Sequence, residues 1–269
     1  MSAKIIAISS ILLLMVLIIV PYYTWASTDC TPVTITNQSF EGTATAAYVA
    51  TSGQTVTGTI DALGCEIGVF VPATASGVTI TATIHDASEF GVFVDGDSGI
   101  TGAPNASGIT VTESTIYNIG NHNAQGAFSP NGVQTGFGIF FSNGATGSIT
   151  NNLIYNYQKA GIVVFDFTSE VSGNTVTGLG PVNFIAQNGI QLGYPKEGYF
   201  FPASNIGGVT ENVVSQNIYT QGSTSGGNPF VATGVLGYFQ LGNKGELTSA
   251  LVSNNNVFNN QADVVVSVS

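Results

Sequence analysis

Short runs of alternating apolar residues, each opened by a glycine, recur along the chain. They read GVFV from Gly68, GVFV from Gly91, GIFF from Gly138, GIVVF from Gly161, GIQL from Gly189 and GVLG from Gly234. Alternation with a period of two, built from Val, Ile and Phe, predicts β-strands. Gly68 and Gly91 are 23 residues apart, as are Gly138 and Gly161, and the longer intervals indicate loops inserted into a basic repeat.

A second motif follows the glycine runs and places a polar residue at a fixed point between apolar ones. It reads VTESTI from Val111, ITNNLI from Ile149, VSGNTV from Val171, VTENVV from Val209 and VSNNNV from Val252. Asparagine tolerates left-handed backbone, and its amide bonds to neighbouring amides and to turn backbone. We therefore expect a ladder of stacked side chains at a sharp bend, made of Ser114, Asn152, Asn174, Asn212 and Asn255.

A repeat of 22 or 23 residues with two or three strands cannot bury its own apolar side. Stacking the repeats at strand spacing buries one continuous core, and each strand then pairs in parallel with its equivalents above and below. Leucine-rich repeats have a similar period but need many leucines, and a β-sandwich would not keep glycine and asparagine in register. The pattern therefore predicts an all-β solenoid.

Three stretches carry a family resemblance: HNAQGAFSPNGVQTGFGIFF, YNYQKAGIVV and GNTVTGLGPVNFIAQNGIQLGY. Together with the repeats, they resemble exported right-handed parallel β-helix proteins of the pectate-lyase-like superfamily in bacteria and archaea, over about positions 55 to 269. The resemblance implies a single-stranded right-handed parallel β-helix with loop insertions. It implies no particular activity, because the superfamily includes lyases, hydrolases, epimerases and non-catalytic proteins.

The N-terminus indicates export. Residues 1–26 contain Lys4 and a 16-residue apolar run from Ile5 to Val20 with only two serines, and we interpret them as a signal peptide. An uncleaved anchor, contacting the membrane through residues 5–25, is the alternative. Both interpretations place residues 27–269 outside the cytoplasm, secreted or at the cell surface, as one β-helix domain in which residues 27–60 form the N-terminal cap and first strands.

The two cysteines of the chain, Cys30 and Cys65, lie early in the exported part. Two cysteines in an exported protein favour a disulfide, which here would tie the N-terminal segment to the first coil. Two buried thiols are the alternative.

Charged residues are only 7 % of the chain, arginine is absent, and four lysines stand against 15 acids, giving a net charge of −11. Mainly helical folds are excluded, because soluble helices cover their outer faces with charged side chains. Nucleic-acid binding is excluded as well, because this surface cannot neutralise phosphates. An anionic polymer would also be repelled unless a cation bridged it to the protein.

The residue two positions after each glycine is predicted to point outward, while its neighbours point into the core. This outward row reads Phe70, Phe93, Phe140, Val163, Gln191 and Leu236. One interpretation is that the insertions at 95–108, 118–137, 178–188, 193–208 and 218–233 cover the row. The others are a protein–protein contact or a groove in which aromatic rings stack on sugars, with Tyr194 and Tyr199 as a groove wall.

From this row we predict an exported, non-catalytic protein that binds an extracellular polysaccharide or a surface protein through Phe70, Phe93, Phe140, Gln191, Tyr194 and Tyr199. The alternative is a polysaccharide lyase or epimerase. Lyases of the resembled superfamily use an Arg or Lys base, and this chain has no arginine, so the candidates are Lys159 with Asp166, and His122. No cofactor is expected, although Asp95 and Asp97 form a candidate calcium pair.

The C-terminal segment Val264–Ser269 reads VVVSVS and predicts a strand without a cap after it. An uncovered strand at the end of a solenoid invites pairing with another chain. We therefore expect end-to-end self-association, or a segment of the same chain covering that edge.

Overall fold

The computed structural model describes residues 29–36, 40, 42–96, 104–142, 144–165, 170–196, 199–201, 208–221, 230–239 and 252–268. Over these ranges the protein is all-β, which confirms the predicted class. The predicted signal peptide or anchor, residues 1–26, lies outside them. In the described part, no helix is long and apolar enough to cross a lipid bilayer.

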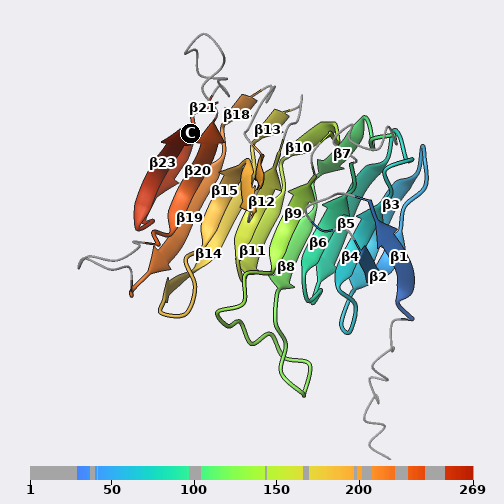
Figure 1. Ribbon diagram of the computed structural model, residues 1–269, viewed down its shortest axis with the longest axis horizontal. Coiled ribbons are helices and arrows are strands. Elements are labelled where there is room, and N and C mark those ends of the chain that lie inside the picture. The colour runs from blue at the N-terminus through green and yellow to red at the C-terminus, as the bar shows by residue number, and fades with distance from the viewer. Residues whose placement is uncertain are drawn as a thin grey trace, which may run out of the picture.

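One long sheet holds nine strands that follow each other in chain order along the molecule (Figure 1). Its first two strands are antiparallel and all later neighbours are parallel. We call it sheet A, and it consists of β1 (Thr31–Ile35), β2 (Gly42–Val49), β4 (Ile67–Val71), β6 (Phe90–Val94), β9 (Phe137–Phe141), β12 (Ala160–Val164), β15 (Asn188–Leu192), β20 (Thr233–Phe239) and β23 (Ala262–Val268).

The second sheet, sheet B, is parallel and contains two stacks of strands that meet at β5 (Thr79–His85). β3 (Thr55–Asp61) pairs with β5 over its whole length. The first stack is β7 (Ile109–Thr112), β10 (Gly147–Thr150), β13 (Glu170–Ser172), β18 (Gly208–Thr210) and β21 (Val252–Ser253). The second is β8 (Thr115–Ile119), β11 (Leu153–Tyr157), β14 (Thr175–Val182), β19 (Val213–Tyr219) and β22 (Asn256–Phe258). A separate hairpin joins β16 (Tyr194–Lys196) to β17 (Tyr199–Phe201).

From β7 onward, each circuit of the chain adds one strand to each stack of sheet B and then one to sheet A. The repeated glycines stand directly above one another because the backbones approach closely there. A Cβ atom on Gly91 would lie 2.5 Å from the carbonyl oxygen of Gly138, and one on Gly138 would lie 2.5 Å from that of Gly161. Any side chain would clash, so the sequence repeats glycine for space.

The bend between the two stacks of sheet B is held by a ladder of buried amides. Asn152 Nδ2 donates to Asn174 Oδ1, Asn174 Nδ2 to Asn212 Oδ1, and Asn212 Nδ2 to Asn255 Oδ1, each at 2.9 Å. Ser114 begins the column, because its backbone N–H donates to Asn152 Oδ1 at 3.0 Å. The side-chain amides of this ladder are thus hydrogen-bonded to one another, as buried polar groups generally are.

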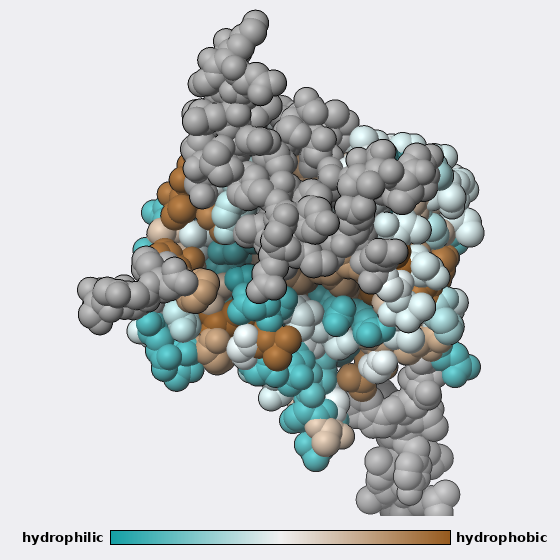
Figure 2. Space-filling view, in the orientation of Figure 1, coloured by the Kyte–Doolittle hydropathy of each residue, from teal (hydrophilic) through white to brown (hydrophobic). Residues whose placement is uncertain are grey.

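The two ends of the stacked strands differ. At the N-terminal end, the predicted disulfide between Cys30 and Cys65 is confirmed, with Cα atoms 5.6 Å apart. A disulfide is typical of oxidising, extracellular compartments. At the other end, β23 pairs with β20 as the last strand of sheet A, and Val264 and Val266 are exposed. Figure 2 shows hydrophobic surface at this end. Self-association there stays a prediction.

Candidate functional site

The outward row of sheet A is not a surface in its N-terminal half. Phe70, Phe93 and Phe140 are only 0–3 % exposed, and Gln191 further along is 2 % exposed. The prediction that these residues form a glycan-binding face is therefore wrong. Tyr194 and Tyr199 lie in the β16–β17 hairpin, and their side chains lie outside the described part of the structure.

A second hydrophobic core covers this half of the sheet, and the N-terminal segment contributes to it. The Phe40 ring meets those of Phe90, Phe93 and Phe140 edge-on, with centroids 4.9–6.1 Å apart. Edge-to-face pairs of this kind add about 0.5–1.5 kcal/mol each beyond their burial. Val33 and Ile35 of β1 and Phe165 after β12 belong to the same core.

Sequence reasoning missed half of this core. The residue before each repeat glycine also faces outward, so Phe90 and Phe137 join the cluster. Neighbouring strands pair these residues in register, Phe90 with Phe137 and Phe93 with Phe140. Strict alternation did not predict this, because at the glycine the inward and outward directions of successive side chains no longer alternate regularly. Phe90 and Phe137 are therefore part of a packed core and do not form a binding surface.

Of the predicted calcium pair, Asp95 belongs to this covering. Asp95 is buried, and its Oδ2 accepts hydrogen bonds at 2.9 Å from both the backbone N–H and the hydroxyl of Thr36. These bonds fix the N-terminal segment against the end of β6. Asp97 and the predicted catalytic residue Asp166 lie outside the described ranges.

Cavities open over part of the C-terminal half of the same face. Two adjoining cavities of about 300 and 360 Å³ share Lys159, Ala186 and Phe230, and we call them together the Lys159 cleft. The first runs along the sheet, lined by Asn188, Val231, Thr233, Leu236, Tyr238 and Val265. The second lies between three connections, lined by Gln134, Phe184, Ile185 and Tyr219. Apolar cavities with a few polar groups are the usual form of small-ligand sites.

Lys159 places a positive charge in this cleft. It directly precedes β12, and its Nζ donates to the backbone oxygen of Ala186 at 2.9 Å. Burial lowers the pKa of Lys159 to about 8, because the ammonium loses water. Within the described ranges no carboxylate lies at ion-pair distance from it. Perturbed charges of this kind gather at functional sites.

Two buried glutamines hold the connections around the cleft. Gln158 Oε1 accepts from the backbone N–H groups of Asn121 and Asn131, and its Nε2 donates to the oxygen of Val133 at 2.7 Å. Gln187 likewise joins the backbone of Tyr157 to that of Leu179. The loops near Lys159 are therefore held in place by hydrogen bonds between these side-chain amides and the loop backbone.

Phe230 stands at the mouth of the cleft with 67 % of its surface exposed and lines both cavities. An exposed aromatic ring beside a partly buried ammonium offers a flat apolar face and a charge to the same ligand.

No protein-family model, curated protein or solved structure matches the chain.

A second cluster of polar side chains, separate from the Lys159 cleft, lies at the same end of the strands as the long loop after β8. In it, both histidines of the chain contact one carboxylate. His85 Nδ1 lies 2.8 Å from Asp86 Oδ2, and His122 Nε2 lies 3.3 Å from Asp86 Oδ1. Asp61 Oδ1 is 3.8 Å from the same nitrogen of His85. His122, predicted as a lone base, is thus a partner of Asp86.

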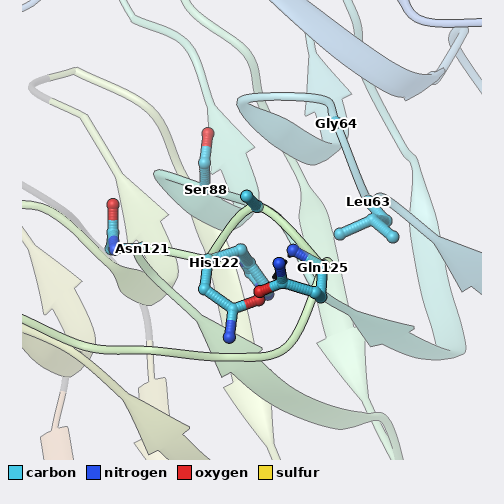
Figure 3. Close-up of a pocket in the computed structure, with 9 residues that line it drawn as sticks. Leu63, Gly64, Ser88, Asn121, His122 and Gln125 are labelled. Atoms are coloured by element: carbon cyan, nitrogen blue, oxygen red, sulfur yellow. Dashed lines mark hydrogen bonds between the residues drawn. The ribbon is translucent and has the colours of Figure 1, made fainter.

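Hydrogen bonds within this cluster favour the charged forms of Asp86 and His85. Burial acts to raise the pKa of Asp86, but hydrogen bonds from His122, His85 and Asn118 together outweigh it and hold the pKa well below its usual value. The hydrogen bond to Asp86 raises the pKa of His85 against the effect of burial. His122 also borders a cavity of about 600 Å³, where the 121–126 loop faces Leu63 and Gly64 (Figure 3).

The sequence carried part of the signal for this cluster. Once β3 and β5 are stacked, Asp61 and His85 fall on neighbouring positions of adjacent strands. His122 could not be placed, because it is brought back to Asp86 by an irregular loop that no periodicity describes.

Proposed function

We propose that the chain is an exported right-handed parallel β-helix protein that binds an extracellular glycan in the Lys159 cleft. The fold part of this proposal is supported by the three parallel stacks, the aligned glycines and the amide ladder. Crossover connections between parallel strands of one sheet are right-handed in about 98 % of cases. The resemblance of the repeats to pectate-lyase-like proteins favours the same fold.

The lining of the cleft favours a sugar with a carboxylate. Phe230, Tyr219 and Phe184 offer aromatic faces for the C–H side of a pyranose ring. Lys159 offers one charge-assisted hydrogen bond to an acid group. With a net charge of −11, the protein repels a polyanion, so an isolated uronic acid within a neutral glycan is the matching ligand.

The observation that carries this proposal is the ammonium of Lys159, held in the cleft without a carboxylate partner among the described residues. Keeping an unpaired charge partly out of water costs stability. A ligand carboxylate would compensate this cost on binding.

A glycan array followed by calorimetry tests the proposal. Wild-type protein is expected to bind glycans that carry a uronic acid. Lys159→Met removes the charge and should weaken binding about tenfold to a hundredfold, the usual range for a charge-assisted hydrogen bond. Lys159→Arg, a matched control, keeps the charge. The proposal fails if Lys159→Met binds the same glycans as tightly as wild type.

A second candidate function, a polysaccharide lyase, is favoured by one observation. A lysine with a pKa of about 8 is partly neutral near physiological pH and can act as a general base. β-Elimination would leave an unsaturated uronate, which absorbs near 235 nm. Absence of this absorbance with every bound glycan, or activity that survives replacement of both Lys159 and His122 by alanine, would remove this candidate.

A further inference from the structure

The cluster around Asp86 has the composition of a metal site. Asp61, His85 and Asp86 each present one donor atom, and these three atoms lie within 4.8 Å of one another. In a tetrahedral zinc site with bonds of about 2.0–2.1 Å, neighbouring ligand atoms are about 3.3 Å apart. The observed separations of 2.8 Å between His85 and Asp86 and 3.8 Å between His85 and Asp61 bracket that value.

We propose that Asp61, His85 and Asp86 bind a divalent transition-metal ion of the zinc type, with water in the fourth position. One imidazole nitrogen beside two carboxylates suits such ions, whereas calcium and magnesium prefer oxygen ligands throughout. The Asp61 side chain is 43 % exposed, so an ion can enter from solvent. This site is separate from the Lys159 cleft and does not depend on the function proposed for it.

His122 completes the arrangement from outside. Its Nε2 lies 3.3 Å from the Asp86 oxygen that does not face His85. A neutral imidazole can donate a hydrogen bond there and leave the other oxygen to the metal. Partners of this kind orient a metal's carboxylate ligands and raise affinity. His122 is therefore a positioning residue for the ion.

The fold holds the three ligands ready. Parallel pairing of β3 with β5 sets Asp61 beside His85 in register. The His85 ring is stacked on Tyr117, with centroids 5.1 Å apart, which fixes its direction. Little side-chain freedom is left for the metal to remove, and preorganisation of this kind favours binding.

The bend at Asp86 does not itself need a carboxylate. Asp86 has a left-handed backbone, with φ of 64°, and the aligned residues of the next two circuits, Asn118 and Asn156, have φ of 56° and 52°. Asn156 Nδ2 donates to Asn118 Oδ1 at 3.1 Å, so an amide satisfies this position. The acid that follows β5 therefore points to a further role, which metal binding supplies.

The test uses the full exported chain, purified without a histidine tag and treated with a chelator. Zinc should raise the melting temperature and bind with a stoichiometry of one in calorimetry, and calcium should do neither. Cobalt in place of zinc should give the intense visible absorption of a tetrahedral site. Absence of zinc binding, or binding of calcium in preference to zinc, overturns the proposal.

Variants locate the ion. Asp86→Asn should abolish zinc binding while keeping the fold, because asparagine occupies the same bend in the next circuits. Asp61→Asn, at a partly exposed strand end, is the second variant and should weaken binding at least tenfold. His122→Gln should weaken it about tenfold to a hundredfold. Glu170→Gln, an exposed acid on β13, is the control and should bind as wild type. Undiminished zinc binding by Asp61→Asn and Asp86→Asn overturns the proposal.

Discussion

The two halves of the outer face of sheet A share one backbone register and differ in what they carry. From β4 to β9 the face holds phenylalanines, and the N-terminal segment packs on them through Phe40. From β15 to β23 the same positions hold Asn188, Gln191 and Leu236, and the Lys159 cleft opens there. The stacked strands thus provide the same backbone surface in both halves. The outward side chains determine whether that surface is covered by a packed core or borders a cavity.

The difference shows how a repetitive fold separates stability from binding. Large aromatic side chains on the first half bury apolar surface and hold the chain's N-terminal segment. Smaller and polar side chains on the second half leave space, and connections fixed by Gln158 and Gln187 enclose it. Stability should therefore be most sensitive to changes in the first half, and ligand binding to changes in the second.

Phe140→Ala should have the largest effect on stability. Phe140 is fully buried among Phe40, Phe93 and Phe165, so its loss leaves a cavity and should lower the free energy of unfolding by about 3–5 kcal/mol. Leu236→Ala, in the same outward row but beside the cleft, should cost about 2 kcal/mol, the low end of the range for a buried leucine, because space already exists there. Urea unfolding measures both, and equal losses would contradict the distinction between the two halves.

Phe40→Ala tests the covering of the first half. The ring is partly buried and touches three phenylalanines, so its removal should cost about 2 kcal/mol. It should also uncover Phe90, Phe93 and Phe140, and the native protein should then bind a hydrophobic dye. A variant with unchanged stability and no dye binding would show that Phe40 does not cover the face.

Lys159→Met should have the opposite sign and raise the free energy of unfolding by about 1–2 kcal/mol at pH 7. Folding lowers the pKa of this amine from 10.5 to about 8, so between these values the unfolded chain binds a proton that the folded protein does not. The lysine's destabilising effect is complete below pH 8 and fades as pH rises toward 10.5.

Denaturation curves at pH 7 and pH 10 check this sign. The stability difference between Lys159→Met and wild type should shrink at the higher pH. If Lys159→Met is less stable than wild type at pH 7, the cost of burying the Lys159 ammonium is already offset by other groups in the ligand-free protein.

Phe230→Ala should have the smallest effect on stability, within about 0.5 kcal/mol, because the ring is largely exposed. It should nevertheless weaken glycan binding about tenfold, since a stacking face is lost. Parallel unfolding and calorimetry experiments separate the two effects. A loss of stability as large as that for Phe40→Ala would place Phe230 in the packed core.

Periodicity predicted the all-β class, because glycine and asparagine recur wherever backbones approach or bend. It also gave the inward and outward directions along β6, where Val92 and Val94 enter the inner core and Phe93 does not. What lies on top of an outward residue is set by long-range contacts such as Phe40 on Phe140, which leave no periodic trace. Lys159 was singled out, but its cleft depends on loops whose lengths and paths do not repeat.

The charge state of Lys159 is the most direct measure of the cleft's role. In carbon NMR of protein labelled at lysine Cε, with Lys159→Met used for assignment, the Lys159 signal should titrate near pH 8, apart from the other lysines. Addition of glucuronate should shift that titration to higher pH, because a bound carboxylate stabilises the ammonium. A Lys159 signal that titrates above pH 10 and does not respond to the sugar acid would contradict the proposed site.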